Sequence, residues 1–203
     1  MISIAPQPEP GDFDLQIRQP GARFLATNPS PSSNDWETHW SRATPWLVEG
    51  YKHICAYSCL RIYRDANDPT VDHYLPKSKY PALAYEWHNF RLCTLRMNRR
   101  KWNHEDVLDP FIIQPGWFVL DFQTVLIKSN TTLDDGLRNR VKATIERLKL
   151  NHEQDIQARL SRIQDYIQGH YTFDYLRTEA PFIAYELIRQ ELVQTILSNG
   201  LLR

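Results

Sequence analysis

The sequence predicts an α+β fold with a small strand-containing core between helical segments, and three patterns support this. Residues 107–111, 117–122 and 125–128 alternate apolar and polar side chains, as half-buried strands do. From Leu133 onward, apolar residues recur at the spacing typical of helices with one buried face. A hydrophobic fraction of 42%, with six tryptophans in 203 residues, indicates a folded chain that buries a real core.

Residues 1–33 are predicted to form an extended arm, because prolines are concentrated there. Proline fixes φ and removes an amide donor, so neither a helix nor a central strand is expected. Apolar residues such as Phe13, Ile17 and Phe24 would let the arm lie along the body or dock on a partner. The prolines in question are Pro6, Pro8, Pro10, Pro20, Pro29 and Pro31.

Residues 34–130 are predicted to hold the core with its flanking helices. Asn34 and Glu37 have the spacing of a capping box, and Pro45 suits the first turn of a second helical segment. A short helical lead-in is therefore expected. The run 54–63 partly alternates like a strand, and residues 64–69 have the composition of a turn.

Residues 131–203 are predicted to be a helical C-terminal region packed on the core. Three amphipathic stretches carry apolar residues at helical spacing, namely Leu137–Leu148, Ile156–Ile167 and Phe182–Ile196, and the last ends near Gly200. Such stripes pack on their own core by default, and the alternative of an interface for another chain stays open.

Charge on this chain is balanced overall but uneven along the sequence. Lys plus Arg and Asp plus Glu both number 24, so no global field attracts a polyanion. Any contact with nucleic acid must therefore be local. Between residues 71 and 104 basic residues dominate: Lys77, Lys79, Arg91, Arg96, Arg99, Arg100 and Lys101 stand against Asp72 and Glu86. A merely solvated basic face is the competing interpretation.

The sequence also indicates the compartment. No apolar run approaches the roughly 20 residues that cross a bilayer, and the N-terminus lacks a signal-peptide pattern, so a cytoplasmic protein without membrane contact is expected. The three cysteines, Cys55, Cys59 and Cys93, are expected to be thiols or metal ligands and not disulfides.

One stretch carries the pattern of a catalytic motif. Asp72 and His73 precede the turn 76–78, Asn89 follows His73 by sixteen residues, and Asn98 follows nine residues later beside a basic run. This joint pattern resembles the HNH endonucleases. The resemblance implies a ββα-metal core, with strands at 71–75 and 90–93, a loop at 76–86, a helix at 95–103 and one divalent ion.

The resemblance also implies roles for the individual residues. Asp72 would ligate the metal together with Asn98, and His73, whose ordinary pKa near 6.5 suits a general base, would deprotonate the attacking water. Asn89 would hold the hairpin loop by bonding backbone groups. Oxygen ligands favour Mg²⁺, with Mn²⁺ as a substitute. Lys77, Arg99, Arg100 and Lys101 are predicted nucleic-acid contacts, although ordinary surface charge is the competing interpretation for each of them alone.

The sequence around the motif narrows the resemblance. It is similar to HNH proteins encoded beside an ATPase in Septu and retron-associated anti-phage systems. The similarity covers roughly residues 50–190, implies an endonuclease effector with an ATPase partner, and favours DNA over RNA as the substrate. Its segments are Cys55-Ala56-Tyr57, Val71-Asp72-His73, Leu83-Ala84-Tyr85-Glu86-Trp87, Leu108-Asp109-Pro110-Phe111 and residues 143–151.

The cysteines depart from that pattern. Such relatives carry two C-x-x-C pairs that bind a structural zinc ion, whereas Cys55 and Cys59 form a C-x3-C and Thr94 and Met97 stand where the second pair should be. A structural zinc ion is therefore not expected, and Thr94 and Met97 should pack in its place. A makeshift site from Cys55, Cys59, Cys93 and His53 is the open alternative.

Two other hypotheses stand beside an active nuclease. The chain could be a catalytically silent HNH-fold subunit used for interaction or nucleic-acid binding, although the complete set of Asp72, His73, Asn89 and Asn98 favours activity. Alternatively, it could be active only in a complex with its partner. The choice between a homo-oligomer and a hetero-complex, and between nicking and double-strand cleavage, stays open.

Overall fold

The computed structural model describes residues 1–63 and 68–199, which divide into two compact units. The motif unit comprises Ala5–Ala56 and Ile62–Glu105, and the helical unit comprises Met1–Ile4, Tyr57–Arg61 and the chain from Asp106 onward. The strands pair as two separate two-stranded antiparallel sheets among helices, so the α+β class is confirmed. The candidate motif lies within the motif unit.

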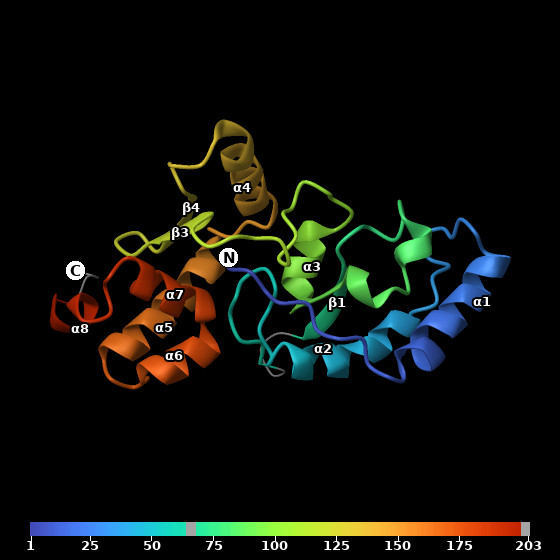
Figure 1. Cartoon of the computed structure of the whole chain (residues 1–203), viewed down its shortest axis with the longest axis horizontal. Coiled ribbons are helices and arrows are strands. Elements are labelled where there is room, and N and C mark those ends of the chain that lie inside the picture. Colours follow the sequence, from blue (N-terminus) through green and yellow to red (C-terminus); the bar gives the residue numbers. More distant parts are fainter. Residues whose placement is uncertain (64–67, 200–203) are drawn as a thin grey trace. The chain divides into compact units, whose positions relative to one another are not determined.

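The centre of the motif unit is an antiparallel strand pair followed directly by a helix (Figure 1). β1 (Pro69–His73) pairs with β2 (Phe90–Thr94), and α3 (Leu95–Lys101) starts at the next residue. All five residues of β2 are buried. The connection contains two short 3-10 helices, η3 (Pro81–Leu83) and η4 (Trp87–Asn89). The strands and the helix therefore lie within two residues of their predicted positions.

The lead-in is helical, but it starts later than expected. η2 (His39–Ala43) is a 3-10 helix, and α2 (Thr44–Gly50) has a proline in its first turn, as predicted for Pro45. Residues 34–38 form no helix, so the capping-box prediction was wrong. The run 54–63, expected to be strand-like, consists of turns and isolated bridges. The turn predicted at 64–69 falls mostly outside the described residues.

The prediction of an extended arm was wrong for residues 14–27. Residues 14–27 form a π-helix, η1 (Asp14–Arg18), that continues into α1 (Gln19–Thr27). Pro20 lacks the N–H that would bond the carbonyl of Gln16 in an α-helix. That carbonyl instead accepts a hydrogen bond from the Arg42 guanidinium at 2.9 Å, and the wider π turn accommodates the interruption. Burial of Phe13 and Ile17, both 0% exposed, favours the helix.

The helical unit contains a second hairpin and five helices among its described residues. β3 (Phe118–Asp121) and β4 (Leu126–Ser129) lie at two of the predicted strands and pair with each other. Residues 107–111, also predicted to be a strand, form turns. The helices are α4 (Asp135–Arg147), α5 (Glu153–Ile167), α6 (Phe173–Glu179), α7 (Pro181–Arg189) and α8 (Thr195–Asn199).

The third predicted amphipathic stretch is interrupted between α7 and α8. Glu191 adopts a left-handed φ of 58°, and the N–H of Leu192 donates to the carbonyl of Leu187 at 2.8 Å. This is a common way for a helix to end. The helix end predicted near Gly200 lies outside the described residues. In the described part of the chain, every helix is too short or too polar to cross a membrane.

Polar side chains connect the helices of this unit to its hairpin. Glu186, which is fully buried, accepts a hydrogen bond from the backbone N–H of Leu120 at 2.9 Å. The Asn151 side chain bonds both the N–H and the carbonyl of Ile127, each at 2.8 Å. Because such groups are costly to bury without partners, these bonds fix α7 and the α4–α5 connection against the hairpin.

Candidate functional site

The candidate site is a cleft of about 410 Å³ in the motif unit. It brings together five of the predicted site residues: Asp72, His73, Lys77, Asn98 and Arg99. The other residues that line it are Ser33, Trp36, Pro76, Ser78, Leu95, Trp102 and Asn103. The end of β1, the loop after it and α3 therefore supply the predicted groups, and the lead-in supplies one wall.

Asp72 is held by a buried ion pair. Its side chain is 2% exposed, and its Oδ2 lies 3.3 Å from the ammonium nitrogen of Lys101, whose side chain is 0% exposed. Lys101 also donates to the backbone carbonyl of His73 at 2.8 Å. We expected Lys101 to contact phosphate. In this structure its ammonium group is enclosed and contacts the Asp72–His73 pair.

His73 is fixed in orientation and in tautomer. Its Nε2 lies 2.8 Å from the carbonyl oxygen of Ala84. A carbonyl can only accept, so Nε2 carries the proton and Nδ1 has the free lone pair. Trp40 and Phe90 contact the ring edge-to-face, with centroids 4.9 and 5.3 Å away.

The surroundings also keep His73 neutral. Burial lowers its pKa to about 3, and the charges of Lys77 and Lys101 act in the same direction, outweighing the opposing hydrogen bond to Ala84. At neutral pH the ring is therefore in the form that can accept a proton, but a pKa of about 3 makes it a weaker base than the ordinary imidazole that the sequence predicted.

Asn89 connects the two ends of the loop between the strands. Its Oδ1 accepts from the N–H of Leu75 at 2.8 Å, and its Nδ2 donates to the carbonyls of Leu75 and Leu83 at 3.0 and 3.1 Å. The side chain is 2% exposed and does not line the cleft. Asn89 therefore shapes the loop that carries Lys77.

The side-chain amide of Asn98 is held against β1 through its nitrogen. Its Nδ2 donates to Thr70 Oγ1 at 3.1 Å and to the carbonyl of Val71 at 3.0 Å, so both amide protons are directed to β1. The amide orientation is thereby fixed. Among the described residues no hydrogen bond engages Oδ1, which leaves that atom available to a cation in the cleft.

The basic side chains differ in their placement. Lys77 lies over the rings of Trp36 and Trp40, with its nitrogen 5.4 and 5.1 Å from the centroids. Burial lowers the pKa of Lys77. Arg99 is exposed and lines the cleft, whereas Arg100 is half-buried and does not.

The sequence did not reveal the aromatic wall from the lead-in. The sequence assigned Trp36 and Trp40 no role at the site. In the structure, Tyr85 lies 5.6 Å from Trp40, and its hydroxyl donates to the carbonyl of Glu37 at 2.7 Å. No local motif signals this long-range packing. Trp102 was missed as well, because the predicted helix ran to residue 103, whereas α3 ends at Lys101 and Trp102 begins a turn.

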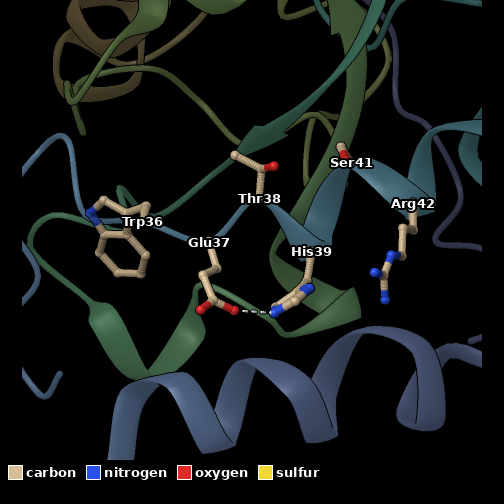
Figure 2. A pocket seen from close by; sticks show the side chains of 6 residues that line it. All are labelled: Trp36, Glu37, Thr38, His39, Ser41 and Arg42. Carbon is tan, nitrogen blue, oxygen red and sulfur yellow. Dashed lines mark hydrogen bonds and ion pairs between the residues drawn. The ribbon is translucent and has the colours of Figure 1, made fainter. Parts of the chain in front are cut away.

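A second hollow, of about 490 Å³, lies along the lead-in (Figure 2). Its side chains are those of Trp36, Glu37, Thr38, His39, Ser41 and Arg42. Glu37 and His39 form a hydrogen bond of 2.6 Å there. Because no predicted site residue lines this hollow, the catalytic hypothesis belongs to the first cleft, with which it shares Trp36.

The three cysteines are buried, and none forms a disulfide bond within the part of the chain that the structure describes. Burial raises the pKa of Cys93 well above its ordinary value, and nearby Asp72 and Cys55 act in the same direction. Thr94 caps α3 by accepting the N–H of Met97 at 3.2 Å, and Met97 is 1% exposed. Within residues 1–63 and 68–199, no group of three or more His, Cys, Asp or Glu residues could hold a metal ion.

Comparisons with known proteins found a partial sequence similarity to a protein of a defence system. No protein-family model matches the chain. The chain is similar to the Septu protein PtuB of Bacillus thuringiensis. The two are 29% identical over 96 residues, which cover 43% of this chain and 37% of the relative. The similarity spans less than half of either protein, and it supports a relationship to Septu-type proteins.

Proposed function

We propose that this chain is a metal-dependent endonuclease of the HNH type that hydrolyses phosphodiester bonds, in DNA in preference to RNA. One observation carries the proposal: a carboxylate, a neutral histidine, an amide oxygen and two cations line a single cleft. The similarity to a Septu protein supports a role in an anti-phage defence complex with an ATPase partner.

The oxygen atoms in the cleft fit a hard divalent ion. Asp72 and Asn98 would hold it, since Mg²⁺ prefers oxygen ligands and commonly keeps several waters while using one or two protein groups. Mn²⁺ would substitute. When bound, the ion would supply positive charge to the oxygens on which charge develops during phosphodiester hydrolysis.

His73 would act as the general base. Its neutral ring has the lone pair at Nδ1, where it can accept the proton of a water that attacks phosphorus. The bond from Nε2–H to the carbonyl of Ala84 holds the ring in place and stabilises the imidazolium that forms. Lys77 and Arg99 would bind the phosphates, and Trp36 and Trp40 hold Lys77 in position.

The alternative is a catalytically silent HNH-fold subunit that binds nucleic acid or a partner. The ion pair between Asp72 and Lys101 favours it, because the ammonium group engages the carboxylate that a metal ion would need. In an active enzyme the same contact would orient Asp72 and leave part of the carboxylate for the metal. Activity measurements distinguish the two.

A cleavage assay tests the proposal. The chain is incubated with plasmid DNA or RNA in Mg²⁺, alone and with an ATPase encoded beside it. We expect metal-dependent cleavage that EDTA abolishes and that His73→Ala slows by about 100-fold or more, as for loss of a general base. His88→Ala is the matched control, because His88 is exposed and does not line the cleft. Absence of cleavage from the complex, or full activity of His73→Ala, would contradict the proposal.

A further inference from the structure

Trp102 is the most exposed of the large apolar side chains that line the cleft within the described residues. It follows α3 directly and is 69% exposed, yet it lines the same cleft as Asp72, His73 and Asn98. Burying an indole ring is among the larger contributions a side chain can make to stability. This ring contributes little of that kind, because most of it faces solvent.

The backbone at Trp102 is unfavourable for tryptophan. Its φ of 47° and ψ of −126° match the first central position of a type II′ turn, where glycine is the usual residue. The turn is closed by a hydrogen bond of 3.0 Å from the N–H of His104 to the carbonyl of Lys101. Residues other than glycine rarely adopt a positive φ, as Trp102 does. Backbone strain of this kind is concentrated at functional sites. Folding alone would favour glycine at this position.

A neighbouring side chain also holds the Trp102 ring in position. His104 contacts it edge-to-face with centroids 5.9 Å apart. Two cations, Lys77 and Arg99, line the same cleft. A ligand that fits this surface has a flat apolar face and carries negative charge within reach of that face.

Nucleic acid with an unpaired base has that chemistry. In a duplex the faces of each base are covered by its neighbours, whereas an unpaired base can stack on an aromatic side chain while cations hold the backbone. We propose that Trp102 stacks on an unpaired base beside the phosphate held in the cleft, so that the preferred substrate is single-stranded or locally unpaired. This inference rests on the proposed nuclease function and specifies its substrate.

Binding measurements test the inference apart from cleavage. All proteins carry His73→Ala and are studied without divalent metal, by the fluorescence anisotropy of a labelled DNA strand of about 12 nucleotides and of the matching duplex. We expect Trp102→Gly to weaken single-strand binding about tenfold and to leave duplex binding unchanged, and Trp102→Phe to keep most of the affinity. Tyr175→Ala, which removes another exposed aromatic ring outside the cleft, should bind like the parent.

Thermal melting separates loss of the ring from loss of the fold. Because glycine suits the backbone at this position, Trp102→Gly should melt no lower than the parent. Equal single-strand affinity of the Trp102→Gly variant and the parent, an equal loss on both DNAs, or no single-strand binding by the parent would each overturn the inference. Wild-type cleavage distinguishes the two proposals. Cleavage without Trp102-dependent binding removes only the inference, and Trp102-dependent binding without cleavage removes only the nuclease.

Discussion

The ammonium group of Lys101 contacts both Asp72 and the backbone of His73 although its side chain is 0% exposed. The sequence has Lys101 three residues after Asn98, which puts the two on one face of the helix predicted at 95–103. It did not show that this part of the face is turned into the protein. α3 has only seven residues, and the strand on which it packs decides which side chains are enclosed.

The buried pair predicts a non-additive effect on stability. Lys101→Met should lower the free energy of unfolding by about 3–5 kcal/mol, because it removes the positive charge beside the buried Asp72 carboxylate. The double variant Asp72→Asn with Lys101→Met should be less destabilised than Lys101→Met alone. Urea unfolding of the two single variants and the double variant measures the coupling. Strictly additive losses would show that the two charges do not depend on each other.

At the scale of the element, α1 packs against Tyr85, whose ring also contacts Trp36 in the wall of the cleft. A Cβ added at Gly21 would lie 2.1 Å from Cγ of the Tyr85 ring, and Tyr85 in turn supports Trp40 and the backbone of Glu37. Glycine is normally unfavourable inside a helix by up to about 1 kcal/mol relative to alanine. Here the absence of a side chain allows the helix to pack on Tyr85.

Gly21→Ala should therefore destabilise the protein, by roughly 1–3 kcal/mol, where helix propensity alone would stabilise it. Thermal and urea unfolding measure the change. Gly11→Ala is the matched control, since a Cβ there meets nothing within 4 Å, and it should leave stability almost unchanged. A Gly21→Ala variant as stable as the parent would mean that Tyr85 does not pack against α1 as described.

The secondary structure was predictable where local signals agree with tertiary packing. The strands of the motif, α2 with Pro45 in its first turn and the long amphipathic helices are such cases. The N-terminal helix was not, because Pro20 argues against it locally, whereas the bond from Arg42 and the burial of Phe13 that allow it come from packing. The break after α7 depends on the positive φ of Glu191. The sequence did not indicate it, because glycine, the usual residue for that conformation, is absent at this position.

At the scale of the whole molecule, the candidate site belongs to one unit of a two-unit chain. Asp72, His73 and Asn98 could be named from their spacing, and the structure brings them to one cleft. Trp36, which lines the cleft, and Trp40, which contacts His73, could not be named. The lead-in lies more than thirty residues before the motif, and its position depends on Tyr85. The sequence therefore indicated the proposed chemistry, whereas the shape of the cleft could be known only from the folded structure.

The central claim is that His73 accepts a proton during metal-dependent cleavage, and chemical rescue extends the cleavage assay to test it most directly. DNA cleavage in Mg²⁺ is measured for the His73→Ala variant, with the ATPase partner present, before and after imidazole is added. The account predicts that imidazole restores part of the lost activity in His73→Ala and none in Asp72→Asn, where a metal ligand is missing. Cleavage by His73→Ala at the wild-type rate without imidazole would contradict it.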